Sequence, residues 1–143
     1  MAGVEWLVPE EAVYHWEGAL AGMAAAGAAV RIETLIELAE ARRRAGDGQA
    51  AREAYLRAAD LARREQDAPR LARAALGFHA IGSRMWWPPS QTVTLLSEAL
   101  EALATGDELM RLRVMASLAR VLAWHRLDVP RARALAEQAV ASA

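Results

Sequence analysis

Apolar and small residues recur along most of the chain at the spacing of one helix face. In residues 49–65, Ala51, Tyr55, Ala58 and Ala62 lie three or four positions apart, which is the period of an amphipathic α-helix. The same spacing elsewhere, together with residues that start and stop helices, predicts seven helices. They cover residues 10–26, 31–45, 49–65, 67–81, 91–104, 108–126 and 128–142.

The predicted helix boundaries coincide with residues that have a physical reason to be there. Pro9 suits a first helical turn, where its missing N–H costs nothing. Gly46 suits a helix end, while Asp47 and Ser90 suit N-cap positions, where a side-chain oxygen accepts a hydrogen bond from a free backbone N–H. These signals separate the helices by short turns, apart from one irregular stretch at 82–89.

The helices also form a repeat with a period near 40 residues. Four segments each contain a triplet of residues. The first and third residues of the triplet are small, and the second follows the first by four positions and precedes the third by three. The second residue is large in the first three segments. They are Ala12, Trp16, Ala19; Ala51, Tyr55, Ala58; Thr92, Leu96, Ala99; and Ala132, Ala136, Ala139. The last residues of these triplets are 39, 41 and 40 positions apart. Such a regular period indicates a stack of similar helical units.

Composition narrows the fold and function further. The 143 residues include 35 alanines and 18 leucines but one Phe and two Tyr, so we expect an all-α protein. Seventeen cationic residues against 18 acidic ones leave no cationic excess, so direct nucleic-acid contact is not expected. The absence of cysteine excludes disulfides and thiol catalysis, and it fits a reducing compartment.

The length suits one domain, 1–143, with residues 1–9 as an N-terminal extension and 10–143 as the repeats. The N-terminus has no basic start followed by a long apolar run, so no secretory signal is predicted. The Ala-rich run 19–30 is too short to cross a bilayer, which takes about 20 residues. We therefore expect a cytoplasmic protein with no membrane contact.

The second predicted hairpin resembles the tetratricopeptide repeat. In the first helix, that family has a large residue followed by a Leu-small pair, which here are Leu35 and Leu38-Ala39. A Gly-Asp turn follows, here Gly46-Asp47. The second helix then has Ala, an aromatic residue and Ala in order, here Ala51, Tyr55 and Ala58. Leu76-Gly77 and Leu118-Ala119 repeat the Leu-small pair. The resemblance implies a right-handed superhelical stack of antiparallel helix hairpins. The period departs from the family's 34 residues, the closing proline is missing, and Ala136 replaces the aromatic residue.

The longer period and phrases such as Leu-Ala-Arg-Ala-Ala-Leu-Gly (71–77) are similar to the helical repeats of large ATP-dependent actinobacterial transcription activators of the LuxR and MalT-like kind. That family's ATPase and helix-turn-helix DNA-binding domains are not expected in these residues. Nucleotide hydrolysis is not carried over, because a phosphate-binding loop needs a lysine and the chain has none.

The array also looks incomplete, as if it were part of a longer one. Helix 10–26 matches the second helix of a hairpin, and the last helix still carries apolar Leu135 and Val140. Because solenoids need polar capping repeats, the ends could be covered by a partner or in a homodimer. The alternative is that Val4, Trp6 and Leu7 fold back as a cap.

Matching to the tetratricopeptide pattern also implies which residues line the concave face of the first helices. These are Glu33, Ile36, Glu40, Arg43, Phe78, Arg113, Arg120 and Trp124, with Trp86 near the mouth. A groove of mixed Arg, Glu and aromatic residues could hold a helix or an extended peptide. The alternative is an ordinary solvated face with intrahelical ion pairs.

The segment 84–89 is the one the repeat does not explain. From Leu76 to Thr92 is three residues longer than from Leu38 to Ala51, and the insertion holds Trp86, Trp87 and two prolines. A rigid pair of indoles could wall a small-ligand pocket or contact a partner. The alternative is that both rings fill a gap beside small alanines.

No catalytic or metal-binding constellation is found. Glu11 and His15 share a helix face, but no second such pair accompanies them. We expect no enzyme activity, no cofactor and no metal. The sequence favours a non-catalytic protein or peptide interaction module, or an effector sensor, of a transcriptional regulator that binds through its concave face. The alternative function is a small-ligand-binding domain with a pocket walled by the Trp86/Trp87 loop.

Overall fold

A computed structural model describes residues 8–26, 30–82 and 87–143, and these residues form seven helices and no strand. The helices are α1 (Pro9–Ala25), α2 (Ile32–Arg44), α3 (Gly48–Arg64), α4 (Ala68–Gly82), α5 (Ser90–Ala102), α6 (Glu108–Trp124) and α7 (Val129–Ser142). The all-α prediction is confirmed, and each helix end lies within about two residues of its predicted position. Val4, Trp6, Leu7 and Trp86, which carried predictions above, lie outside the described residues.

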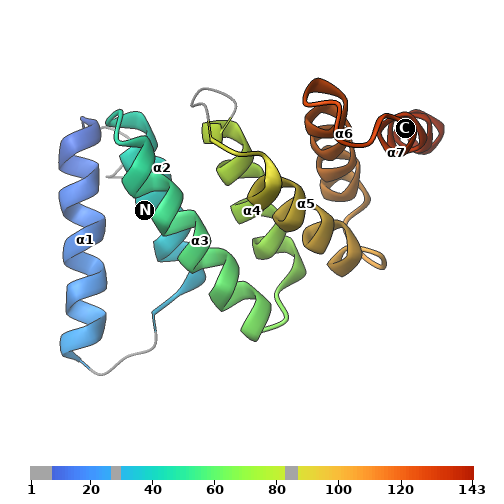
Figure 1. Ribbon diagram of the computed structural model, residues 1–143. Helices are drawn as coiled ribbons and strands as arrows, with labels where there is room; N and C mark the ends of the chain where they lie inside the picture. Colours follow the sequence, from blue (N-terminus) through green and yellow to red (C-terminus); the bar gives the residue numbers. More distant parts are fainter. Residues whose placement is uncertain (1–7, 27–29, 83–86) are drawn as a thin grey trace.

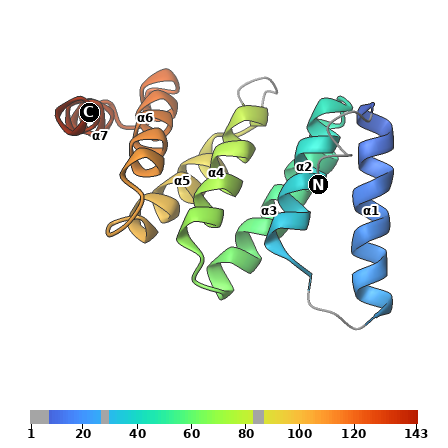
Figure 2. The same cartoon turned by 180° about the vertical axis from the view of Figure 1, so that it is seen from behind.

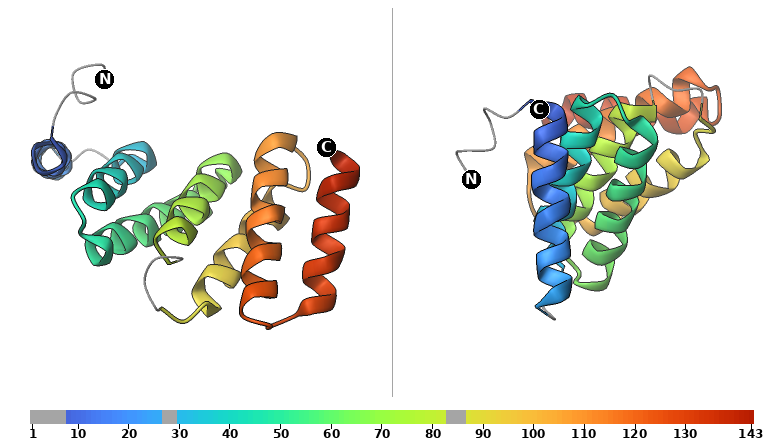
Figure 3. Two further views of the ribbon diagram at one scale, coloured as in Figure 1. Left: turned by 90° about the horizontal axis from the view of Figure 1, so that it is seen from above. Right: turned by 90° about the vertical axis from the view of Figure 1, so that its left-hand side faces the viewer.

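The helices stand in a row rather than in a closed bundle. Each helix contacts the next one along the chain, α2 also contacts α4, and α4 also contacts α6. Helices α1 and α7 lie at opposite ends of the row (Figures 1 and 2), and the view from above shows the hairpins following one another (Figure 3). The pairs α2/α3, α4/α5 and α6/α7 are therefore three stacked hairpins, with α1 packed on the first. We call the surface of α2, α4 and α6 the first-helix face.

Aspartates begin four of the helices in the same way. The Oδ1 atom of each accepts a hydrogen bond from the backbone N–H three residues later, at 2.9 to 3.1 Å. The four are Asp47, Asp67, Asp107 and Asp128. This confirms the predicted cap at Asp47. The cap predicted at Ser90 is wrong, because α5 begins at Ser90 itself and Pro89 takes the N-cap position without a side-chain cap bond.

Small residues let the helices approach closely in the core. Alanines of the repeat triplets, including Ala51, Ala58 and Ala99, are fully buried, and so are the larger middle residues Tyr55 and Leu96. The close approach is tightest at Gly77, where a side chain would collide with the Tyr55 ring. Small size at these positions is therefore a packing requirement as well as a helix preference.

Ion pairs cross from hairpin to hairpin on the surface. Glu17 of α1 accepts from Arg42 of α2 at 3.1 Å, and Arg63 of α3 donates to Glu98 of α5 at 2.7 Å. Exposed pairs of this kind contribute little each, so the row is held mainly by apolar packing. No helix within the described residues is long and apolar enough to cross a membrane.

Candidate interaction surface

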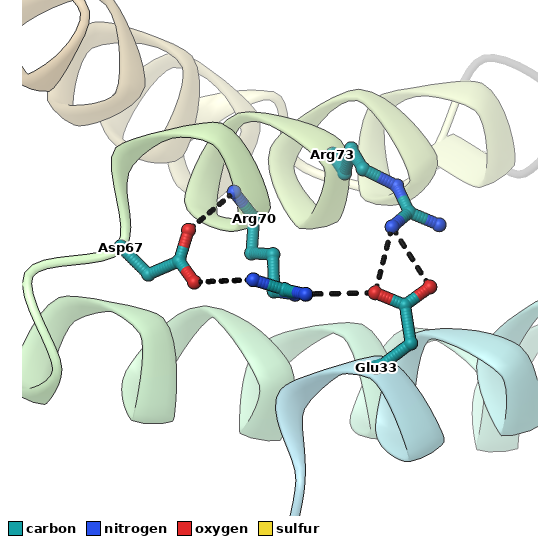
Figure 4. Close-up of polar contacts among 4 residues, drawn as sticks. All are labelled: Glu33, Asp67, Arg70 and Arg73. Carbon is teal, nitrogen blue, oxygen red and sulfur yellow. Dashed lines mark hydrogen bonds and ion pairs between the residues drawn. The ribbon is translucent and has the colours of Figure 1, made fainter.

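The predicted site residues divide into three groups, and the first group is occupied by contacts between helices. Glu33 on α2 accepts from Arg70 at 3.1 Å and from Arg73 at 2.9 Å, both on α4, and Arg70 also donates to Asp67 at 2.8 Å (Figure 4). Glu33 therefore joins the first helices of two successive hairpins.

The electrostatics of this cluster agree with its geometry. Partial burial works to raise the pKa of Glu33, but hydrogen bonds from Arg73 and Arg70 and their charges outweigh it, so its pKa is lowered. The pKa of Asp67 is lowered in the same way, against its own burial, by hydrogen bonds from the side chain and backbone of Arg70. A groove of about 580 Å³ lies beside the cluster and includes Val30 and Glu65 in its lining. Three of its charged lining residues, Glu33, Asp67 and Arg70, are already paired with one another or with Arg73.

Glu40 and Arg43 are also engaged inside their own hairpin. Arg43 donates to Glu40 at 2.8 Å, and the Tyr55 hydroxyl of α3 donates to the other oxygen of the same carboxylate. Burial works to raise the pKa of Glu40, but the hydrogen bonds from Tyr55 and Arg43 outweigh it and lower its pKa. Burial, and then the bond to Glu40, raises the pKa of Tyr55. Glu40 thus links α2 to α3 through Tyr55, while Arg43 pairs with Glu40 within α2.

The second group is buried or half-buried. Phe78 is only 3% exposed and Ile36 only 2%, so the expectation that they line an open face is wrong. The guanidinium of Arg52 covers the Phe78 ring at 5.2 Å from its centroid and lies 4.8 Å from the centroid of Trp87. Arg52 also donates to Gln91 of α5. Phe78 is covered because a long side chain from the preceding hairpin reaches over it.

In this structure Trp87 packs against the core and against Arg52. It is half-buried and lines neither of the two grooves described in this subsection. Sequence reasoning missed Arg52 altogether. A signal was present, because Arg52 occupies the position directly after a buried repeat alanine, where a long side chain can reach the next hairpin.

The third group is open. Arg113, Arg120 and Trp124 are all exposed on α6, and Trp124 is 82% exposed. They are seven and four positions apart, so they share one face of the helix. Within the described ranges, no carboxylate forms an ion pair with either arginine. Nearby, burial and then the charge of Arg120 lower the pKa of His79 on α4, so the neutral form of this ring is favoured beside the face.

A further groove, which sequence reasoning did not predict, lies between α6 and α7. It measures about 520 Å³, and it is lined by alanines of both helices, among them Ala119 and Ala136, and by valines of α7 such as Val140. Its charged lining residues are Arg120 and Arg133. The signal was Ala136 in the repeat position that is aromatic or leucine elsewhere, because a small residue there leaves the space between the helices unfilled.

Helix α1 carries the other chemistry considered from the sequence. The rings of His15 and Trp16 meet edge to face at 5.0 Å, and His15 Nε2 and Trp16 Nε1 are buried without a hydrogen-bond partner among the described residues. No group of three or more His, Asp or Glu residues that could hold a metal ion occurs in the described part of the chain.

Comparisons of the chain with protein-family models, with curated proteins and with solved structures gave no match.

Proposed function

We propose that the chain is a non-catalytic interaction module of a transcriptional regulator, which binds a protein or peptide partner, or senses an effector, through its first-helix face. The partner contacts α6 and carries an acidic residue beside a bulky apolar one. The module acts in the cytoplasm and makes no direct contact with nucleic acid.

The observation that carries the proposal is the open face of α6. Two arginines that form no ion pair with any described carboxylate lie there, together with an exposed tryptophan. Tryptophan and arginine are the residues that most often dominate binding energy at protein interfaces. The carboxylate of a partner would pair with Arg113 or Arg120, and an apolar side chain would pack on the Trp124 ring.

The link to transcription rests on the sequence resemblance to the repeats of LuxR and MalT-like activators. In tetratricopeptide-type stacks the first helices line the concave side, and α6, which carries the open residues, is the first helix of its hairpin. The row of stacked hairpins is compatible with that arrangement.

Selection of short helical peptides from a phage-displayed library on the full chain tests the proposal. Enriched peptides should combine Glu or Asp with a bulky apolar residue, and Arg113→Glu should weaken their binding by about tenfold in fluorescence anisotropy. The matched control is Arg57→Glu, which changes an exposed arginine on α3. Loss of binding by both variants alike, or enrichment of peptides without acidic residues, would contradict the proposal.

The small-ligand pocket walled by Trp86 and Trp87 stays a prediction. Trp86 lies outside the described residues, and Trp87 stacks on Arg52, so no observation in the structure favours it.

A further inference from the structure

The groove between α6 and α7 corresponds to the grooves of the two preceding hairpins, and in those hairpins a helix fills the groove. The groove between α2 and α3 receives α4, which contacts both helices, and the groove between α4 and α5 receives α6 in the same way. By repetition of the same packing, the groove between α6 and α7 fits one more helix. Figure 3 shows α6 and α7 side by side at the end of the row.

The floor of this groove has room for a large side chain. Tyr55 and Leu96 fill the middle repeat position in the preceding hairpins and are fully buried, and the Tyr55 ring lies against Gly77 of the next helix. Ala136 takes that position in α7 and is exposed. The occupant must therefore supply the bulk that α7 lacks.

Helix α1, at the other end of the row, carries such a side chain on an open face. Tyr14 is 81% exposed, and Gly18, Ala21 and Ala25 follow it at the spacing of one helix face. These small residues let another helix approach closely. The packed side of α1, with the buried Ala12 and Trp16, faces α2.

The two ends of the row are also opposite in charge. Helix α1 contains Glu10, Glu11 and Glu17 and no arginine. The groove between α6 and α7 contains Arg120 and Arg133 and no acidic residue in its lining. Opposite charges across an interface speed association and fix the relative placement of the partners.

We propose that the groove between α6 and α7 binds helix α1 of a second copy of this chain, so that copies associate head to tail. Tyr14 of the incoming helix fills the space over Ala136. Glu10 and Glu11, which form no ion pair within the described residues, pair with Arg120 and Arg133. The two contacting surfaces are different, so each complex still presents one free groove and one free α1. Head-to-tail contacts of this kind extend into chains or close into rings. The assembly goes beyond the proposed function, because Tyr14 and Ala136 take no part in the proposed peptide contact on α6; Arg120 is the one residue that both proposals use.

Sedimentation velocity of the full chain tests whether copies associate. The mean mass should rise with protein concentration past that of a dimer and should fall as salt is added, because salt screens the charges. Ala136→Arg and Tyr14→Arg each block one of the two surfaces and should each weaken association by at least about tenfold. Both positions are exposed, so circular dichroism should remain that of the unchanged chain. The matched control is Ala134→Arg, at an exposed position on the opposite side of α7, which should associate normally.

Mixing the two blocked variants decides the geometry. Ala136→Arg retains a free α1, and Tyr14→Arg retains a free groove, so the mixture should form a one-to-one complex although neither variant associates alone. A chain that remains monomeric at every concentration would overturn the proposal. So would a dimer that Tyr14→Arg leaves intact, because that dimer would join groove to groove.

Discussion

The ring of Tyr55 on α3 lies directly against the backbone of Gly77 on α4. A Cβ atom at Gly77 would stand 2.3 Å from Cε1 of that ring, far inside van der Waals contact. The ring cannot easily move away, because Tyr55 is fully buried and its hydroxyl is bonded to Glu40. This contact fixes how closely the second hairpin approaches the first.

Gly77→Ala should therefore lower the free energy of unfolding by about 2 kcal/mol, since overpacking a closed core outweighs the better helix propensity of alanine. Urea unfolding followed by circular dichroism measures the change. Gly22→Ala is the control, because a Cβ atom there meets nothing within 4 Å, and it should raise the free energy of unfolding by about 0.5 kcal/mol. Combining Gly77→Ala with Tyr55→Leu should cost less than the sum of the two single changes, and strict additivity would contradict the contact.

Much of this packing follows from the sequence, because the repeat identifies which face of each helix meets its neighbours. The sequence identifies Gly77 as the small member of a Leu-small pair, and Tyr55 as the large member of a repeat triplet. The repeat does not say how far a long side chain reaches sideways. Phe78 was therefore assigned to an open face, whereas Arg52 from the preceding hairpin covers it.

Helix ends can likewise be predicted from the sequence only in part. Gly46 was recognised as a helix end, and it has the positive φ of 83° that favours glycine. Gln66 and Arg126 end helices with positive φ angles of 55° and 51°, but nothing in those residue types indicates that conformation. A turn that does not use glycine is thus invisible to residue type alone.

Gln66→Gly should raise the free energy of unfolding by about 1 kcal/mol, because an L-residue in the left-handed region carries a steric cost that glycine avoids. Thermal unfolding should show a higher midpoint. Glu65→Gly is the control, since Glu65 has an ordinary helical φ of −86° and glycine there should lower the midpoint. A lower midpoint for Gln66→Gly would contradict the assignment of strain.

Trp87→Ala should lower the free energy of unfolding by about 2 kcal/mol, because it removes buried apolar area and the stacking partner of Arg52. Replacing Arg52 by Met in the Trp87→Ala background should then cost less than the same replacement in the unchanged chain. A double-mutant cycle by urea unfolding measures this coupling. Independent effects of the two changes would show that the stacking contributes no stability.

The pKa of His79 should lie below the ordinary 6.5, because burial, and then the charge of Arg120, disfavour its protonated form. Stability linked to His79 is present above the ordinary pKa and is lost as the pH falls through the lowered one. Arg120→Gln should raise the pKa of His79 part of the way back, as measured by an NMR titration of its ring protons. Arg113→Gln is the matched control on the same helix and should leave the pKa of His79 unchanged. Equal shifts in both variants would contradict the proximity of Arg120 to His79.

The contribution of Glu33 to folding stability should decrease as the pH falls. Its pKa in the folded protein is lowered from the ordinary 4.5, since the hydrogen bonds from Arg73 and Arg70 outweigh the effect of burial. The stabilisation is therefore present above pH 4.5 and is lost as the pH falls through the lowered pKa. At neutral pH, Glu33→Gln should lower the free energy of unfolding by about 0.5 kcal/mol, a small effect because the cluster is exposed to solvent.

In strong acid the unchanged chain and Glu33→Gln should become equally stable in urea unfolding, because a protonated glutamate has no more charge than glutamine. Glu37→Gln, one turn further along α2, is the matched control: Glu37 forms no ion pair within the described residues, so its replacement should change stability little at either pH. A deficit of Glu33→Gln that persisted unchanged in acid would show that Glu33 stabilises the row by packing, and not by pairing with Arg70 and Arg73.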